Sequence, residues 1–252
     1  MKRIASVDLN ADVGEGCGAD EELVPLVSSV NISCGAHAGD LATMRRALEL
    51  ALRSGAAIGA HPGFADREHF GRREIPVSAR EAAALVVAQA QALRRVAGGF
   101  GARVGHVKLH GALYTMVSRD GALSRAVVAA LVEDGAQSGE PWELFAMAGS
   151  ALASVGREAG LRVLGEAFAD RSYMRDGSLA PRSEPGGVIG DADAAARQAL
   201  RIARDGLAPT IDGGEIPVNA QTICIHGDGP GAAVLARRIR HELAAAGIAV
   251  GR

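Results

Sequence analysis

The stretch Asp8-Leu9-Asn10-Ala11-Asp12-Val13-Gly14-Glu15-Gly16 lies at the end of the first predicted strand and decides between two folds. Short apolar runs alternate with longer helical patterns along the chain, which is typical of parallel strands joined by helices. That order fits a closed βα barrel or an open doubly wound sheet. An open sheet for dinucleotides carries Gly-x-Gly-x-x-Gly at this point. The acidic residues found here would repel a pyrophosphate, so the sequence favours an α/β barrel.

Seven strands are predicted, one fewer than a TIM barrel has. They span residues 4–9, 29–33, 57–60, 104–109, 143–146, 162–167 and 222–225. Helices are predicted near 40–54, 78–97, 119–134, 149–159, 191–206 and 230–246, with a short hairpin within 209–221. Candidate end residues are the capping pair Ser78 and Glu81, the N-caps Asp40 and Asp191, and the stop residues Gly55 and Gly160. We expect a single domain over residues 1–252.

The composition excludes several classes of protein. With 48% hydrophobic residues the chain can bury a sizeable core. A net charge of −2 and 3% aromatic residues argue against a basic nucleic-acid binder with stacking platforms. No apolar run is long enough for a membrane helix. We therefore expect neither nucleic acid nor a membrane as a partner.

Lysine and cysteine usage adds two constraints. The only lysines are Lys2 and Lys108, and neither follows the glycine pattern of a Walker A loop, so no standard P-loop is present. The N-terminus lacks the apolar run of a signal peptide. Cys17, Cys34 and Cys224 show no Cys-x-x-Cys spacing, so we expect reduced thiols and a cytoplasmic location.

Polar residues gather where the predicted strands end, and catalytic groups of βα barrels lie at the C-terminal ends of the strands. Six of the seven predicted strands end in such residues, and only the fifth does not. The residues, in strand order, are Asp8, Asn10, Asp12 and Glu15; Asn31, Ser33, Cys34, His37 and Asp40; His61 and Asp66; Lys108, His110 and Tyr114; Glu166, Asp170 and Arg171; and His226 and Asp228.

Four histidines follow strands on the same predicted face and are expected to line a site: His37, His61, His110 and His226. His69 and His241 are instead interpreted as ordinary structural histidines. Lys108 lies in an apolar strand pattern and should point inward, where a charge is costly unless it is paired. Its candidate partners are Asp8, Asp12 and Glu166.

Two long connections, residues 62–76 and 171–190, exceed what a barrel needs. They carry Arg72, Arg73 and Arg182, which suit an anionic ligand because guanidinium groups bind carboxylates and phosphates in a bidentate manner.

Six segments together resemble the LamB/YcsF family, in the same order and from the first strand to the last: residues 8–16, 31–40, 58–62, 108–114, 166–173 and 226–230. The chain departs from the family pattern at Ala36, where an aromatic residue is common, and at Leu109, where proline is common. These positions bear on the shape of the pocket.

The resemblance implies a distorted, seven-stranded TIM-like barrel similar to the glycoside hydrolase/deacetylase superfamily. It also implies a 5-oxoprolinase role: the ATP-dependent opening of 5-oxo-L-proline to L-glutamate, as the first of three subunits that acts together with subunits B and C. Because no P-loop is present, ATP, with Mg²⁺, would be handled jointly with the partner subunits.

Ring opening needs a base for water, an acid for the leaving nitrogen and donors for the oxyanion. The predicted catalytic residues are Asp12, His61, Lys108, His110 and Glu166, with Asp12 or Glu166 as base and His61 or His110 as acid. Predicted substrate-binding residues are Asp8, Asn10, Asn31, His37, Arg72, Arg73, Asp170, Arg171, Arg182 and His226.

Two alternatives remain open. One is a metal-dependent amide hydrolase of the deacetylase type, in which Asp8, Asp12, His37, His61 and His110 would supply the ligands of a divalent metal. The other is a non-catalytic ligand-binding subunit whose partners carry out the chemistry.

Overall fold

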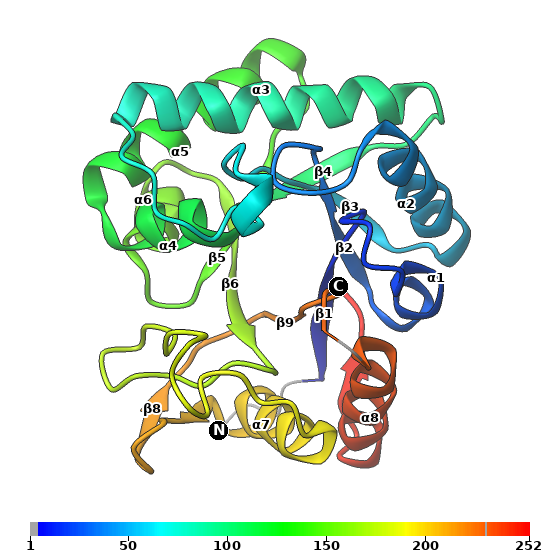
Figure 1. The fold of residues 1–252 in the computed structure, drawn as a ribbon, viewed down its shortest axis with the longest axis vertical. Helices are drawn as coiled ribbons and strands as arrows, with labels where there is room; N and C mark the ends of the chain where they lie inside the picture. The colour runs from blue at the N-terminus through cyan, green and yellow to red at the C-terminus, as the bar shows by residue number, and fades with distance from the viewer. Residues whose placement is uncertain (1–4, 230) are drawn as a thin grey trace.

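Seven parallel strands close into a barrel in the computed structural model, which describes residues 5–229 and 231–252 (Figure 1). The strands are β1 (Ser6–Val13), β2 (Ser29–Ser33), β3 (Ala57–His61), β4 (Val104–Lys108), β5 (Glu143–Met147), β6 (Arg162–Phe168) and β9 (Thr222–Ile225). Strand β9 pairs with both β6 and β1, which closes the ring. The predicted barrel with seven strands is therefore confirmed.

Helices lie outside the barrel, and each of the six predicted helices is found. They are α2 (Leu41–Ser54), α3 (Ala79–Gly98), α5 (Gly121–Ser138), α6 (Ala151–Glu158), α7 (Ala192–Asp205) and α8 (Ala232–Ala245). Residue 230, at the predicted start of the last helix, lies outside the described residues. The hairpin of β7 (Leu207–Pro209) and β8 (Glu215–Pro217) is also confirmed.

Local capping explains where several helices begin. The Asp40 carboxylate accepts a hydrogen bond from the Thr43 backbone N–H at 2.8 Å, and Ser78 forms a capping box with Glu81. The Asp191 side chain accepts from the Ala194 backbone N–H at 2.7 Å. Each of these side chains satisfies a backbone donor at a helix start, as predicted for helix caps.

Several short elements have no counterpart in the sequence prediction. Helix α4 (Gly111–Arg119) precedes α5, whereas the sequence pattern predicts one helix over 119–134. The others are α1 (Asp20–Leu23), η1 (Val24–Leu26), η2 (Arg67–His69) and β10 (Ala249–Val250). Helix α4 begins with His110 and Gly111 and has no side-chain cap, so its start lacks the usual sequence signal.

Strand β1 is longer than predicted, and this changes which residues reach the site. The predicted strand of residues 4–9 begins at Ile4, outside the described residues, and the observed strand continues to Val13. Asp8 pairs in register with Thr222, the first residue of β9, and so lies toward the N-terminal end of the barrel. Asp12 lies four residues further along, at the opposite end.

The barrel interior is polar, whereas the layer between strands and helices is apolar. In β1, Leu9, Ala11 and Val13 belong to the buried apolar core. The alternate residues Asn10 and Asp12 bond to polar side chains of neighbouring strands, as expected because successive strand residues face opposite sides.

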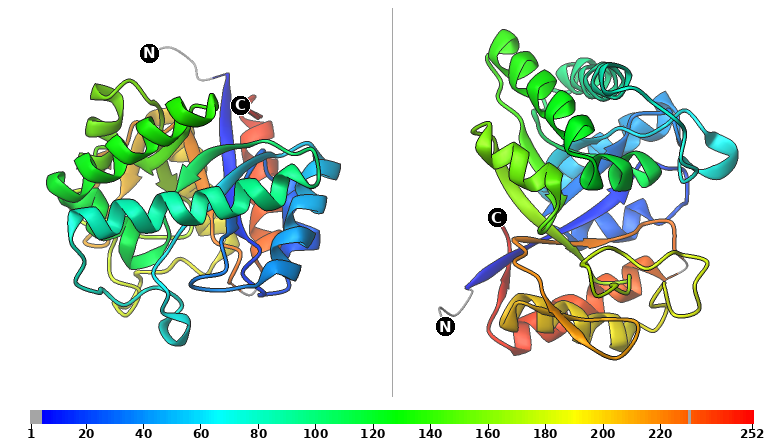
Figure 2. Two further views of the ribbon diagram at one scale, coloured as in Figure 1. Left: turned by 90° about the horizontal axis from the view of Figure 1, so that it is seen from above. Right: turned by 90° about the vertical axis from the view of Figure 1, so that its left-hand side faces the viewer.

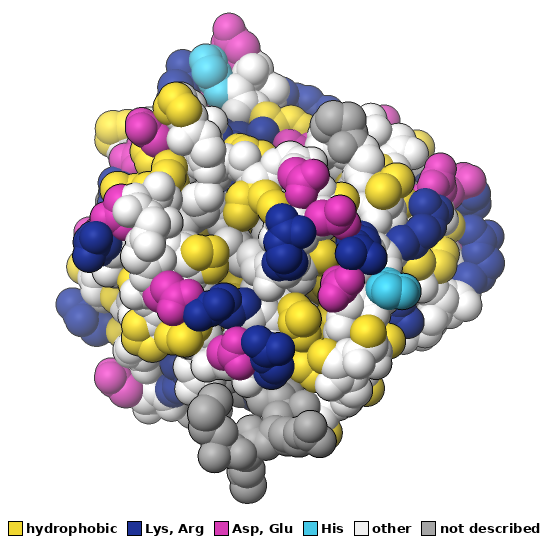
Figure 3. All heavy atoms as spheres, turned by 90° about the horizontal axis from the view of Figure 1, so that it is seen from below, with side chains coloured by type: hydrophobic (Ala, Val, Ile, Leu, Met, Phe, Trp, Pro, Cys, Tyr) yellow, Lys and Arg dark blue, Asp and Glu magenta, His cyan; other side chains and the backbone are white. Residues whose placement is uncertain are grey.

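The two ends of the barrel differ (Figure 2). The C-terminus and the start of β1 lie at one end, where β10 pairs with β1. The connections that follow β3 and β6 lie at the other end. Over the face that carries α7 and α8, basic and acidic side chains are interspersed (Figure 3), and ion pairs such as Arg238 with Asp193 join them. Among the described residues, no helix has both the length and the apolar character needed to cross a membrane.

Candidate active site

A cavity of about 500 Å³ opens where the barrel strands end. Its polar lining comes from β1, β3, β4 and α4 and from the loops after β3, β6 and β9. The lining side chains that carry a charge or an imidazole are Asp12, His61, Arg72, Glu74, Lys108, His110, Arg171, Arg182 and His226. A larger depression of about 710 Å³ between α2 and α3 has a mainly apolar lining, with two arginines and no carboxylate or histidine. The first cavity is therefore the candidate site.

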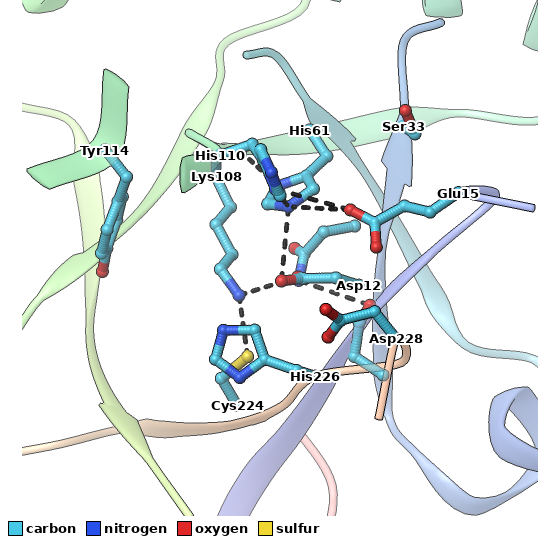
Figure 4. A network of polar contacts seen from close by, with 12 residues as sticks. Asp12, Glu15, Ser33, His61, Lys108, His110, Tyr114, Cys224, His226 and Asp228 are labelled. Carbon is cyan, nitrogen blue, oxygen red and sulfur yellow. Dashed lines mark hydrogen bonds and ion pairs between the residues drawn. The ribbon is translucent and has the colours of Figure 1, made fainter. Parts of the chain in front are cut away.

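Lys108 lies at the centre of the polar network (Figure 4) and is only 2% exposed. Its ammonium donates to Asp12 Oδ1 at 2.8 Å and lies 2.9 Å from Glu166 Oε1. It also contacts Cys224 Sγ at 2.8 Å. Burial alone would lower the pKa of Lys108, but the negative groups around it outweigh burial and hold the pKa well above its ordinary value. Lys108 is therefore a fixed cation.

Asp12 joins the lysine to the histidines. Its Oδ1 accepts from Lys108 and from Asn31 Nδ2 at 2.9 Å, while its Oδ2 lies 3.3 Å from His61 Nε2. Burial raises the pKa of Asp12, but the contacts with His61 and Lys108 reverse this effect and place the pKa well below its usual range. Asp12 is ionised and borders the cavity.

Three imidazole rings and one carboxylate form a second buried group beside Asp12. His37 Nε2, His110 Nδ1 and His61 Nε2 lie 3.1, 3.4 and 3.9 Å from Glu15 Oε1. The ligand atoms of these four residues all lie within 4.8 Å of one another. This is a donor set that can hold a metal ion.

Burial dominates the protonation of this group. It lowers the pKa of His37 to about 3, with the nearby His61 adding to the effect, and it places that of His110 well below 6.5. Burial and the charges of Asp12 and Asp228 raise the pKa of Glu15 well above its usual value. Burial thus favours the neutral forms of His37, His110 and Glu15.

Glu166 is fully buried behind the cavity wall and does not line the cavity. Tyr114 Oη donates to its Oε2 at 2.7 Å, and Asn10 Nδ2 donates to its Oε1 at 3.1 Å. Together with Lys108, these contacts occupy both carboxylate oxygens. Glu166 therefore holds Lys108 and Tyr114 in place.

His226 faces the cavity from the end of β9. Its Nδ1 lies 2.9 Å from Asp170 Oδ1, and its ring stacks on Phe168 with the centroids 5.7 Å apart. Burial raises the pKa of Asp170, but the His226 charge and hydrogen bond lower it overall. No hydrogen bond from the described residues engages His226 Nε2, so this nitrogen is available for proton transfer.

The predicted arginines take different places. Arg72 borders the cavity and pairs with Asp228 at 2.5 Å, and Arg182 borders the cavity with no carboxylate within 4.0 Å among the described residues. Arg73 is absent from the cavity lining and lies 3.3 Å from Asp66. Arg171 donates to the Gly187 and Ala180 carbonyls, so it anchors the loop after β6.

Three predicted substrate-binding residues of the barrel interior do not reach the cavity. Asp8 accepts hydrogen bonds from Ser28, Ser29 and Thr222 at the far end of the barrel. Asn10 and Asn31 lie beneath Lys108 and Asp12 and bond to each other at 2.7 Å. The placement of Asp8 and Asn10 follows from the greater length of β1, and it removes Asp8 from the predicted metal ligand set as well.

Two residues outside the predicted set belong to the site. Glu15 follows Asp12 in the same acidic segment, and the turn at Gly14, with φ of 71°, brings the segment back over the barrel. Cys224 lies inside the apolar pattern of β9, so nothing in the sequence distinguishes it from a core residue. In the sequence, the position of Glu15 three residues after Asp12 is the feature that could have identified it as a site residue.

The chain is similar to known proteins along almost its whole length. The model of the LamB/YcsF family matches residues 7–252. A lactam utilization protein from Thermus thermophilus is 44% identical, with a TM-score of 0.86 over 98% of this chain and 99% of that one.

Two more distant structures share the fold alone. A family 4 carbohydrate esterase from Streptomyces lividans is 12% identical, with a TM-score of 0.51 over 100% of this chain and 94% of that one. A T48 deacetylase is 14% identical, with a TM-score of 0.52 over 97% of this chain and 86% of that one. The expected likeness to deacetylase-type barrels is confirmed.

Proposed function

The chain belongs to the LamB/YcsF family, and on this premise we propose that it opens the lactam of 5-oxo-L-proline to L-glutamate with ATP hydrolysis, acting with partner subunits B and C. The observation that carries the proposal is the identity of 44% along nearly the whole chain to a lactam utilization protein. A cavity lined by acid–base groups and free cationic side chains supports it.

The chemistry balances with ATP as the activating reactant. The γ-phosphoryl group of ATP passes to the lactam oxygen, one water adds to the former carbonyl carbon, and the carbon–nitrogen bond breaks as the nitrogen takes a proton, which leaves an acyl phosphate. A second water hydrolyses this acyl phosphate, so 5-oxoproline, ATP and two waters give glutamate, ADP and phosphate. Preorganised positive charge stabilises the oxygen on which charge develops. Lys108 borders the cavity and is a permanent cation, so it fits that role.

Asp12 is the better candidate for the base. The sequence leaves Asp12 and Glu166 as alternatives, but only Asp12 borders the cavity, and a base must lie within hydrogen-bond reach of the attacking water. Glu166 already accepts from Tyr114, Asn10 and Lys108. We assign Glu166 the task of positioning Lys108.

His226 is a better proton donor for the leaving nitrogen than His61 or His110. His61 Nδ1–H donates to the Lys108 carbonyl and His110 Nε2–H donates to the Phe70 carbonyl, each at 2.8 Å. Their remaining nitrogens, His61 Nε2 and His110 Nδ1, lie 2.9 Å apart and face each other. His226 has its Nδ1 held by Asp170 and presents Nε2, the arrangement of an oriented acid–base histidine.

Arg182 fits the carboxylate of 5-oxoproline. It borders the cavity and has no carboxylate partner among the described residues, whereas Arg72 is already paired with Asp228. A free guanidinium can bind a carboxylate through two parallel hydrogen bonds.

Reconstitution tests the proposal. We expect the isolated chain to turn over neither ATP nor 5-oxoproline, and the chain with subunits B and C to form glutamate and ADP together. Glutamate formation by the purified chain alone, without ATP, would favour a stand-alone amide hydrolase instead.

Variants separate a catalytic subunit from one that only binds ligand. Asp12→Asn in the reconstituted system should lower kcat strongly while the complex still assembles. If Asp12→Asn and His226→Gln both retain wild-type kcat, the chemistry belongs to the partners.

A further inference from the structure

Two neighbouring histidines face each other in a way that neutral rings do not stabilise. A carbonyl oxygen only accepts, so the hydrogen of His61 lies on Nδ1, toward the Lys108 carbonyl, and that of His110 lies on Nε2, toward the Phe70 carbonyl. The remaining nitrogens, His61 Nε2 and His110 Nδ1, are 2.9 Å apart. In the neutral rings two lone pairs therefore point at each other, and either a proton or a metal ion beside them relieves this contact.

The carboxyl group of Glu15 lies beside the same two rings and can pair with a cation bound there. Asp12, Glu15 and Glu166 are each no more than 8% exposed, and the only buried ammonium among them is that of Lys108. Lys108 contacts Asp12 and Glu166, which leaves Glu15 without an ion-pair partner other than the histidines among the described residues. Buried negative charge is costly unless a cation neutralises it.

His37 adds a fourth donor to the same point. Its ring stacks on that of His110 with centroids 3.7 Å apart and planes within 3°, so the two rings present their edges to Glu15 side by side. Its Nδ1 is buried and has no hydrogen-bond partner in the part of the chain that the structure describes. Its Nε2 lies 3.1 Å from Glu15 Oε1 and 3.3 Å from Ser33 Oγ, so it faces the same point as the other rings and presents Nε2 as a ligand once its hydrogen is on Nδ1.

We propose that Glu15, His37, His61 and His110 bind a divalent transition-metal ion of the Zn²⁺ type. Imidazole nitrogens with one carboxylate oxygen are the donors that zinc and its neighbours in the first row prefer, whereas Mg²⁺ and Ca²⁺ prefer oxygen. The backbone bonds of His61 and His110 are the outer contacts that orient metal-bound imidazoles. This goes beyond the proposed function, which uses neither a transition-metal ion nor Glu15.

The site lies at the edge of the cavity. His61 and His110 line the cavity, whereas Glu15 and His37 lie behind them. An ion held by these residues would border the cavity, and if a substrate oxygen joined it as a fifth ligand it would supply Lewis-acid polarisation. Asp12, which contacts Lys108 and His61, would lie next to the ion and outside its ligand set.

Metal binding to the isolated full chain tests the proposal without ATP, 5-oxoproline or partner subunits. After treatment with a chelator and its removal, the chain is titrated with Zn²⁺ and, separately, with Co²⁺. We expect one tightly bound Zn²⁺ per chain and visible Co²⁺ absorption typical of nitrogen and oxygen ligands. Mg²⁺ should not compete. The result is independent of whether the lactam reaction takes place.

Matched variants identify the ligands. Glu15→Gln keeps the shape of the side chain and should weaken Zn²⁺ binding by more than the roughly 10–100-fold cost of losing an outer-sphere partner. His37→Gln should also weaken it. His69→Ala removes an exposed histidine that is bonded to Asp66, and it should bind Zn²⁺ as the wild type does.

Unchanged Zn²⁺ affinity in both Glu15→Gln and His37→Gln would overturn the proposal. So would the absence of stoichiometric binding to the wild-type chain. Nitrogen NMR of the metal-free chain at neutral pH gives a third test. A stable imidazolium at His61 or His110 would contradict the proposal. A proton would then occupy the place that we assign to the ion.

Discussion

Lys108 is a buried cation whose charge is balanced by two carboxylates, so its loss should destabilise the fold as well as the chemistry. Removing one partner of a buried ion pair costs about 3–5 kcal/mol because the other charge is left uncompensated. We expect Lys108→Met to lower the free energy of unfolding by about that amount in denaturant titrations. Adding Glu166→Gln to this variant should recover part of the loss. A change below about 1 kcal/mol for Lys108→Met would mean that the pair is not buried as described.

Arg182 and Arg73 provide a matched test of substrate anchoring, because both lie on loops but only Arg182 borders the cavity. A hydrogen bond to a charged group contributes about 1.5–3 kcal/mol, so Arg182→Ala should raise the KM for 5-oxoproline by about 10–100-fold. Arg73→Ala should leave KM unchanged. Equal effects of the two substitutions on KM in the reconstituted system would contradict the assignment.

His106 should make stability depend on pH. It is fully buried in the barrel, donates from Nε2 to Asn31 Oδ1 at 2.9 Å, and burial holds its pKa well below 6.5. The unfolded chain takes up a proton below about pH 6.5 and the folded chain does not, so folding loses stability as pH falls.

The expected slope for this one group is about 1.4 kcal/mol per pH unit, down to the folded pKa. We therefore expect the unfolding free energy of the wild type to fall relative to that of His106→Gln as the pH is lowered from about 6.5 to 5.5. Measurements use metal-free protein and denaturant titration. A difference that stays constant over this range would show that His106 is protonated in the folded chain.

At the scale of elements, the alternation of strands and helices predicts the fold, and helix caps locate several helix starts. Element ends are harder to predict. In β1, Asp8, Asn10 and Asp12 look like residues that follow a strand, yet they alternate with Leu9 and Ala11 and point into a polar barrel. A polar interior reverses the usual pattern of an apolar inward face. Only tertiary structure shows which of these residues reaches the cavity.

Asp40 tests the assignment of a polar residue after a strand to helix capping. Its carboxylate accepts from the Thr43 N–H, and it is absent from the cavity lining. Loss of such a cap costs about 0.5–2 kcal/mol, so Asp40→Ala should lower the unfolding free energy by about 1 kcal/mol. The kcat and KM of the reconstituted enzyme should stay at wild-type values. A large loss of kcat would place Asp40 in the active site instead.

At the scale of the whole molecule, the barrel brings together residues that lie far apart in the chain. Asp12, Lys108 and His226 are predicted to share one end because parallel strands end together, and they do border one cavity. The contact of Cys224 with Lys108 depends on the register between β9 and β1, which the sequence does not specify. The tautomers of His61 and His110 likewise follow from backbone carbonyls that only the folded chain brings near.

The measurement that tests the account most directly is the yield of glutamate and ADP from 5-oxoproline and ATP. The wild-type chain is combined with subunits B and C. In a parallel reaction, the Asp12→Asn variant replaces the wild-type chain. We predict equal amounts of glutamate and ADP with the wild-type chain, and little glutamate with Asp12→Asn. Full glutamate formation with Asp12→Asn, or by subunits B and C without this chain, would contradict the account.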